Sequence, residues 1–284
     1  MTDSLPPFVT AIWGDEKTGK SSMSLTWPRP IVHLDVDVGG FNRAAWRIKD
    51  LTGIESHAYA PHVDVNKLLG AISTPTAGAT PTVHFPKRIY GARETWQKIV
   101  TAYVEAVQQK EVQTIVIDTW TLTWNIAHNA TLQELQEKQI KKAPNISEDA
   151  LRESLMPKEY GTANSRMRGI IQTARGLSKN LVLILYPKDI YGVRATAQGT
   201  EEYRTGKQEA DGFKETPKLV DIMIRTEVKS ITKTVDGVVS TVAVPQAKIT
   251  TCGMVGLGIS AEGKYLLEPS YNGIVGLMSL LKGE

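Results

Sequence analysis

The sequence predicts an α/β protein: a central, mostly parallel sheet flanked by helices, with a β-hairpin extension at its C-terminal end. Three observations support this fold class. Short apolar segments alternate along the chain with segments of helical spacing. The most apolar of these segments are apolar at consecutive positions and show no alternation of polar and apolar residues. The C-terminal part follows a β pattern around Asp236-Gly237. Strands apolar on both faces are typical of parallel sheets that helices cover on both sides. Asp-Gly is typical of a hairpin turn.

The order of the expected elements follows from this pattern. Strands are expected at residues 8–13, 31–37, 54–59, 114–118 and 181–186, and further β structure at 219–227, 230–234, 238–244 and 248–252. Helices are expected at residues 20–26, 41–52, 93–109, 119–139, 160–179 and 271–282. Segments 61–92, 140–158 and 188–218 are predicted to be irregular, because Pro, Gly and polar residues dominate them. We expect a single domain over 1–284, with its core at about 8–228 and a β-rich extension at about 229–284.

The composition excludes several classes of protein. Hydrophobic residues make up 41 % and charged residues 22 % of the 284 residues, which is typical of a globular chain. The net charge of +3 is too small to indicate a nucleic-acid partner by itself. The single cysteine, Cys252, excludes an internal disulfide. No apolar segment approaches the ~20 residues of a membrane helix, and the N-terminus lacks a signal-peptide pattern, so we expect a cytoplasmic protein without a membrane partner.

A glycine-rich loop follows the first expected strand. Residues 14–21 read GDEKTGKS and match the phosphate-loop pattern G-x-x-x-x-G-K-[ST] at every required position. The glycines permit a tight turn whose N–H groups surround a phosphate, and the next helix adds its positive dipole end. Lys20 is predicted to reach the β- and γ-phosphates, and Ser21 to bind Mg²⁺. The predicted nucleotide-binding residues are Gly14, Asp15, Glu16, Lys17, Thr18, Gly19, Lys20, Ser21 and Ser22.

Asp118 ends the clearest apolar strand. Because the carboxyl ends of parallel strands share one edge of the sheet, this carboxylate is placed to hold Mg²⁺ as a Walker B acid does. The alternative is a cap for the helix that starts near Thr119. The residue after Asp118 is not Glu, so a water-activating base must come from elsewhere.

Asp35 and Asp37, at the end of the second strand, are the best candidates for that base. Asp37 lies two residues after Asp35 and is expected on the same side of the strand. A carboxylate there can orient the attacking water. The alternative is an acid that caps the turn at Gly39-Gly40.

Two further observations limit which nucleotide and which metal ion we expect the protein to bind. No N-K-x-D guanine-reading motif is present, which favours ATP over GTP. The five histidines, His33, His57, His62, His84 and His128, show no metal-binding spacing, so zinc is not expected.

In this order the motifs resemble phage nucleotide-binding proteins with a RecA-like P-loop core, of the AAA-domain and single-strand annealing ATPase type. The resemblance covers about residues 8–228. It rests on GDEKTGKSS at 14–22, the Asp35/Asp37 strand end, the strand ending at Asp118, a helix opened by Glu159-Tyr160-Gly161 with Asn164 and Arg168, and the apolar strand ending at Tyr186.

The resemblance implies roles for several residues. Asp37 matches the position of a catalytic Glu, but its side chain is shorter. Tyr186 occupies a sensor position at the strand end, where it hydrogen-bonds but does not carry a proton near neutral pH. Lys188 follows and is a candidate contact for phosphate or DNA. Lys248 is a candidate for insertion into a neighbouring subunit's site, the alternative being a lysine on an exposed strand edge.

The resemblance also implies single-stranded DNA as a partner, bound through two segments. The first, counted from Lys138 to Lys158, carries a net charge of +2; the second, 188–218, nets zero. Tyr191, Tyr203 and Phe213 are candidate stacking platforms for bases. The alternative for the second segment is a solvated flap.

These observations predict a Mg²⁺-dependent ATPase that acts on single-stranded DNA in phage-type recombination or replication. The predicted catalytic residues are Lys20, Asp37, Asp118 and Tyr186, and the predicted Mg²⁺ ligands are Ser21 and Asp118. We expect a homo-oligomer, either a ring or a filament. Two alternatives remain: a nucleotide-gated assembly protein with little turnover, and a small-molecule kinase, for which 188–218 offers only Arg194 and Arg204 as lid arginines.

Overall fold

A computed structural model of the chain describes residues 5–60, 87–196, 199–235, 238–254 and 260–283. An eight-stranded sheet has the order β10-β9-β8-β1-β5-β4-β2-β3. Its strands are β1 (Val9–Gly14), β2 (Ile31–Asp35), β3 (Ile54–Ala58), β4 (Thr114–Asp118), β5 (Asn180–Leu185), β8 (Ile222–Val235), β9 (Val238–Cys252) and β10 (Tyr265–Leu267). All neighbours from β8 to β3 pair in parallel, while β9 and β10 pair antiparallel. The predicted α/β fold, mostly parallel sheet and C-terminal hairpin are confirmed.

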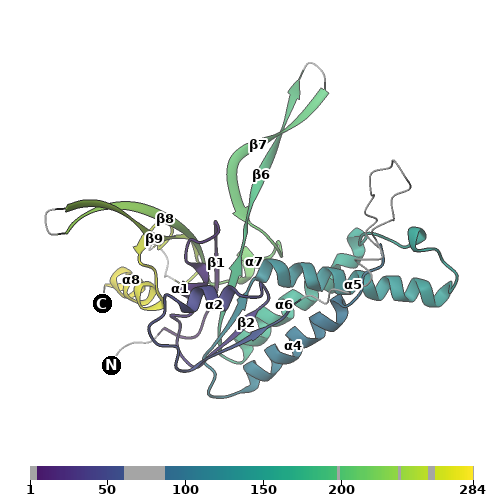
Figure 1. Ribbon diagram of the computed structural model, residues 1–284, viewed down its shortest axis with the longest axis horizontal. Helices are drawn as coiled ribbons and strands as arrows, with labels where there is room; N and C mark the ends of the chain where they lie inside the picture. Colours follow the sequence, from purple (N-terminus) through teal and green to yellow (C-terminus); the bar gives the residue numbers. More distant parts are fainter. Residues whose placement is uncertain (1–4, 61–86, 197–198, 236–237, 255–259, 284) are drawn as a thin grey trace, which may run out of the picture.

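Helices cover both faces of this sheet (Figure 1). They are α1 (Lys20–Ser24), α2 (Gly40–Ala45), α4 (Ala92–Gln108), α5 (Trp120–Lys142), α6 (Tyr160–Gly176), α7 (Thr216–Leu219) and α8 (Tyr271–Lys282). Consecutive strand residues face opposite cores: Ile117 packs with α4, α5 and α6 residues, whereas Val116 packs with Trp27 and Ile274. Burial on both faces explains why the parallel strands are apolar throughout.

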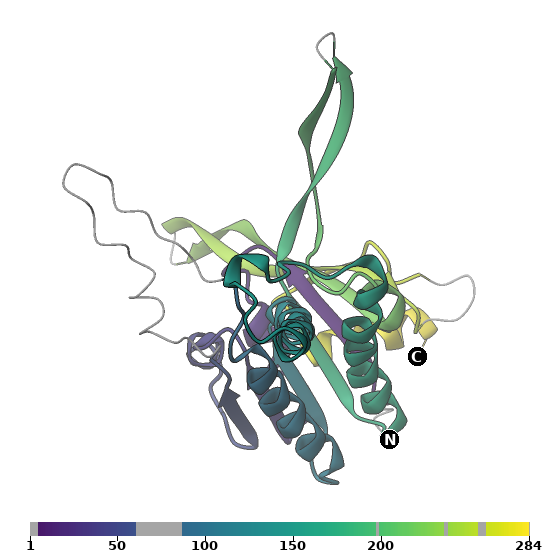
Figure 2. The same ribbon diagram turned by 90° about the vertical axis from the view of Figure 1, so that its right-hand side faces the viewer.

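The segment 188–218 is the main correction to the sequence-based prediction. Most of it forms an antiparallel hairpin of β6 (Pro187–Thr196) and β7 (Gly199–Ala210), which stands away from the sheet (Figures 1 and 2). Ion pairs link its strands, including Arg194–Glu201 and Arg204–Asp189. Because both faces of a two-stranded ribbon are exposed, it lacks the alternating apolar pattern of a half-buried strand. The pairing of charges also explains the segment's zero net charge.

The second hairpin, β8 with β9, is longer than the sequence indicated. Its two strands run without the breaks expected near residues 228–229 and 245–247, and Ile222 pairs with Cys252 at the sheet end. The predicted turn at Asp236-Gly237 lies outside the described residues, as do residues 61–86 with His62 and His84.

The aromatic side chains near the hairpin differ in their environment. Trp120 is fully buried, and Trp124 packs against the same core. Phe213 is 3 % exposed, with its ring 5.6 Å from that of Trp124, so the prediction of a base-stacking platform is wrong for this residue. Tyr191 and Tyr203 are exposed on the β6–β7 hairpin.

Segment 140–158 begins within α5 and then contains the short 3₁₀ turns η1 (Glu148–Ala150) and η2 (Pro157–Glu159). Ion pairs tie it to its surroundings, Lys87 to Glu153 at 2.6 Å and Arg152 to Glu159 at 2.9 Å. In the described part of the chain, every helix is too short or too polar to cross a bilayer.

Candidate nucleotide-binding site

The glycine-rich loop connects β1 to α1 at the carboxyl edge of the sheet. Gly14, the last residue of β1, has a φ of 140°, and a Cβ on it would lie 2.2 Å from the carbonyl oxygen of Thr226 on β8. No side chain fits there. The loop is thus turned sharply against the neighbouring strand, and this position requires glycine.

A hydrogen bond between two hydroxyl groups anchors the loop to β8. Thr18 Oγ1 lies 2.6 Å from Thr226 Oγ1 and donates to the carbonyl oxygen of Asp15 at 2.8 Å. Both threonines are buried. Sequence reasoning missed Thr226, because nothing in the pattern of β8 indicates that it reaches the loop.

Lys20 is held inside the loop that precedes it. Its Nζ donates to the carbonyl oxygens of Gly14 and Asp15 at 2.7 and 2.6 Å, and the residue is 7 % exposed. Burial lowers the pKa of Lys20, and the carboxylates of Asp118 and Asp15 offset part of this effect. The ammonium group is therefore held by backbone oxygens, with weaker support from these carboxylates.

A cavity of about 500 Å³ opens in front of the loop. Its lining residues come from the loop, α1, α2 and the ends of three strands: Glu16, Lys17, Gly19, Lys20, Ser21, Ser22, Asp37, Gly40, Arg43, Ala44, Arg47, Asp118, Thr119, Ile184 and Tyr186. All four predicted catalytic residues and both predicted Mg²⁺ ligands line this cavity. The predicted loop residues Gly14, Asp15 and Thr18 do not line it.

Two buried carboxylates stand side by side at the strand ends, since Asp35 on β2 pairs in register with Asp118 on β4. Asp35 Oδ2 accepts hydrogen bonds from the amides of Gly39 and Phe41 at 2.9 and 3.2 Å. A Cβ on Gly40 would lie 3.1 Å from Asp118 Oδ2 and 3.2 Å from Asp35 Oδ1, so glycine permits this close approach. The capping role proposed for this strand end therefore belongs to Asp35.

Asp118 does not cap the following helix. Thr119 takes that role, because its Oγ1 accepts from the amide of Leu122 at 3.2 Å. Asp118 Oδ2 is buried without a hydrogen-bond partner in the described residues, and His33 Nε2 lies 3.5 Å away. Asp118 lines the cavity, with its Oδ2 close to Gly40 and His33, and sequence reasoning missed this neighbouring histidine.

The donors in the cavity fit Mg²⁺. Magnesium prefers oxygen ligands and is usually held by one or two protein oxygens together with phosphates and water. The Ser21 hydroxyl and the Asp118 carboxylate, with its unpartnered Oδ2, meet this requirement. Within the described ranges, no group of three or more His, Cys, Asp or Glu side chains is arranged to hold a metal.

Asp37 is engaged on both of its oxygens. Tyr186 Oη donates to Oδ1 at 2.8 Å, and Arg43 Nη2 lies 2.5 Å from Oδ2. Burial raises the pKa of Tyr186, and the hydrogen bond to Asp37 adds to that rise. The strand predicted to reach residue 37 ends at Asp35, so the contacts with Tyr186 and Arg43, and not the strand period, position the Asp37 side chain.

Two arginines from α2 and its end also line the cavity, and sequence reasoning missed both. Arg43 lies within α2 and Arg47 in the turn that follows it, and both side chains line the cavity. Arg43 pairs with Asp37, while Arg47 Nη1 lies 3.4 Å from the position that a Cβ on Gly19 would occupy. Arg47 makes no ion pair with the described residues. Their spacing directly after the strand-end glycines was the available signal.

The two candidate lysines of the C-terminal half, Lys188 and Lys248, do not line the nucleotide cavity. Lys188 pairs with Glu209 at 3.2 Å at the base of the β6–β7 hairpin. Lys248 lies on β9 between Arg225 of β8 and Tyr265 of β10, with its Nζ 5.5 Å from the Tyr265 ring centre. The alternative of a strand-edge lysine is therefore wrong, because β10 covers that side of β9.

Comparison with known proteins agrees with this geometry. A protein-family profile described as "AAA domain" matches residues 7–248, which span the loop, the acidic strand ends, the β6–β7 hairpin and most of the β8–β9 hairpin. No curated protein matches the chain significantly. The profile covers most of the sequence and includes every residue that lines the cavity. The chain therefore belongs to the AAA-domain family of P-loop nucleoside triphosphatases.

Proposed function

We propose that the protein is a Mg²⁺-dependent ATPase whose nucleotide state is coupled to single-stranded DNA. The convergence of Lys20, Asp118, Asp37 and Tyr186 on one cavity carries the ATPase part of this proposal. These residues come from four separate segments of the chain, and their types are those that phosphate binding, metal binding and orientation of water require.

Each residue has a distinct role in this proposal. Lys20 and the loop amides bind the phosphates, exchanging the carbonyl contacts of Lys20 for phosphate oxygens. Ser21 and Asp118 would hold Mg²⁺, which would supply positive charge to the phosphates when bound. Asp37 orients the attacking water, and Tyr186 holds Asp37 in place through their hydrogen bond. Arg47 adds positive charge beside the loop.

The position of the β6–β7 hairpin supports the DNA part. β6 begins at Pro187, directly after Tyr186, so the hairpin starts at the wall of the nucleotide cavity. Tyr191 and Tyr203 are 59 % and 41 % exposed on it and offer faces on which bases stack. The resemblance to phage RecA-like proteins adds support for a ring or filament that acts in recombination or replication.

The test is ATP hydrolysis with Mg²⁺, with and without single-stranded DNA, beside Lys20→Ala. We expect turnover that DNA stimulates and that Lys20→Ala abolishes. The matched control is Lys98→Ala, at an exposed position on α4. A rate of ATP hydrolysis that is unchanged in Lys20→Ala would contradict the ATPase proposal. A rate that is the same with and without single-stranded DNA would contradict the coupling to DNA.

One observation favours a second function, a nucleotide-gated assembly protein with little turnover. Both oxygens of Asp37 are already engaged, by Tyr186 and Arg43, which limits its freedom to act on water. This alternative predicts that ATP changes the oligomeric state, measured by light scattering, while phosphate release stays negligible.

A further inference from the structure

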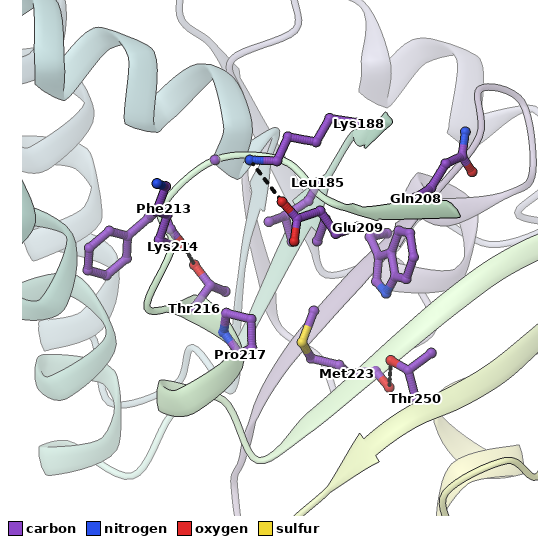
Figure 3. A pocket seen from close by; sticks show the side chains of 13 residues that line it. Leu185, Lys188, Gln208, Glu209, Phe213, Lys214, Thr216, Pro217, Met223 and Thr250 are labelled. Atoms are coloured by element: carbon purple, nitrogen blue, oxygen red, sulfur yellow. Dashed lines mark hydrogen bonds and ion pairs between the residues drawn. The ribbon is translucent and has the colours of Figure 1, made fainter. Parts of the chain in front are cut away.

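A second cavity, of about 490 Å³, lies at the base of the β6–β7 hairpin (Figure 3). Its lining residues are Trp13, Leu185, Lys188, Gln208, Glu209, Ala210, Gly212, Phe213, Lys214, Thr216, Pro217, Met223 and Thr250. None of them lines the nucleotide cavity. Trp13 and Leu185 nevertheless directly precede Gly14 and Tyr186, so the two cavities meet the same edge of the sheet.

The inner lining is apolar and the rim is charged. Trp13, Leu185 and Met223 belong to the core cluster that α4, α5 and α6 cover. Lys188 and Glu209 face each other on one side of the cavity, and Met223 and Thr250 lie on another (Figure 3). Lys214 is exposed and makes no ion pair with the described residues. Such a site suits a ligand with an apolar body and an anionic end.

The indole of Trp13 adds a polar requirement. Trp13 is 6 % exposed, and its Nε1–H has no hydrogen-bond partner in the described part of the chain. A buried donor without a partner is costly, and because this nitrogen is shielded from solvent, a ligand acceptor relieves the cost only where the lining shifts to admit it. Every nucleobase has ring or carbonyl acceptors on a flat, largely apolar body. The attached phosphate suits Lys214 at the rim, since Lys188 is already paired with Glu209 and Asp211.

Gln208 connects this cavity to the phosphate loop. Its Nε2 donates to Asp15 Oδ1 at 3.5 Å, and its Oε1 accepts from Arg225 Nη2 at 2.9 Å. The guanidinium of Arg225 lies 5.0 Å from the ring centre of Trp13. A ligand that displaces Gln208 therefore changes the contacts of Asp15, two residues from Trp13 and within the loop that holds Lys20.

We propose that this cavity binds one nucleotide of single-stranded DNA, with its base directed inward, and that Gln208 transmits its occupancy to the phosphate loop. The inference rests on the DNA-coupled ATPase proposed above. A strand of DNA is favoured over a free nucleotide, because the hairpin that rises from the rim exposes Tyr191 and Tyr203 for neighbouring bases.

The first test compares a fluorescent oligo(dT) with an abasic oligomer of equal length by anisotropy. Thr250→Trp fills the cavity, and Thr241→Trp, at an exposed position on the same strand, is its control. Insertion of one base predicts that wild type prefers oligo(dT) by about fivefold or more. Thr250→Trp should remove this preference, and Thr241→Trp should keep it.

A second variant changes an exposed residue and leaves the apolar lining intact. Lys214→Glu reverses the charge of an exposed rim residue and should weaken oligo(dT) binding, with Lys98→Glu on α4 as the control. Gln208→Ala should keep the preference for oligo(dT) over the abasic oligomer but lose the change in ATP turnover that DNA causes. If free dTMP displaces oligo(dT) when both are present at the same concentration of nucleotide, the choice of DNA over a free nucleotide as the ligand is overturned.

The two proposals fail in different ways. If DNA stimulates ATP hydrolysis but Thr250→Trp and Lys214→Glu bind oligo(dT) as wild type does, the cavity assignment is overturned and the proposed function stands. If wild type hydrolyses ATP but binds no oligo(dT), both the DNA coupling and the cavity assignment are overturned. If ATP is not hydrolysed while the base preference depends on Thr250, the cavity assignment survives the loss of the ATPase proposal.

Discussion

Tyr186 and Asp37, 149 residues apart in the chain, are joined by a 2.8 Å hydrogen bond from the phenol Oη to Oδ1 of the carboxylate. The contact closes one wall of the nucleotide cavity, between the end of β5 and the turn after β2. It also links the residue that starts the β6–β7 hairpin to the acid that we propose orients water. Through this bond, the base of the β6–β7 hairpin contacts the carboxylate that we propose orients the attacking water.

Burial of Tyr186, together with this bond, predicts a pH dependence of stability. Because the pKa of Tyr186 is raised in the folded protein, folded chains retain a proton that unfolded chains lose near pH 10. The stabilisation is complete below about pH 10 and is lost as the pH rises further. Tyr186→Phe should therefore lose stability less steeply than wild type above about pH 10.

Urea denaturation at several alkaline pH values measures this difference. The control is Tyr191→Phe, at an exposed position on β6. Equal slopes for wild type and Tyr186→Phe would show that the phenol does not retain its proton in the folded state.

Arg47→Ala should weaken ATP binding. Its guanidinium lies beside Gly19 without an ion-pair partner in the described residues, and a hydrogen bond to a charged group contributes about 1.5–3 kcal/mol. We expect the Kd for ATP to rise by at least about tenfold in isothermal titration calorimetry. Lys49→Ala, a neighbouring exposed cation, is the control. A Kd equal to that of wild type would place Arg47 outside the nucleotide contacts.

Two glycine substitutions should shift stability in opposite directions. Gly14→Ala puts a Cβ against the Thr226 carbonyl at a positive φ, and we expect it to lose about 1–3 kcal/mol. Gly169→Ala lies within α6, where a Cβ would meet no atom within 4 Å, and should gain about 0.5–1 kcal/mol. Chemical denaturation of both variants measures these changes. A stable Gly14→Ala protein would contradict the close approach of the loop to β8.

Thr226→Val should loosen the phosphate loop while preserving the shape of β8. The substitution removes the buried hydroxyl that Thr18 contacts at 2.6 Å, at a cost of about 1 kcal/mol in unfolding free energy. Because Thr18 lies in the loop, ATP affinity should fall as well. Thr241→Val on the exposed part of β9 is the control and should change neither quantity. Lost stability with unchanged ATP affinity would mean that the anchor does not order the loop for binding.

The sequence by itself determined the elements whose signal is local. Glycine spacing, Lys20 and Ser21 identify the loop within eight consecutive residues, and continuous apolar runs identify buried parallel strands. The edge shared by the carboxyl ends of parallel strands then places Asp118 beside the loop without any structure. Such patterns can be recognised in the sequence because the backbone geometry of a turn or a strand restricts which residues occur at neighbouring positions.

The tertiary structure decided the contacts between distant segments. Asp37 is positioned by Tyr186 and Arg43, the loop is anchored by Thr226, and Gln208 reaches Asp15 from the hairpin. The hairpin itself was missed because an exposed ribbon buries no face and so leaves no periodic pattern. Contacts between side chains on different strands cannot be predicted from a single sequence. The sequence shows only which residues are neighbours along the chain, and folding brings distant residues together.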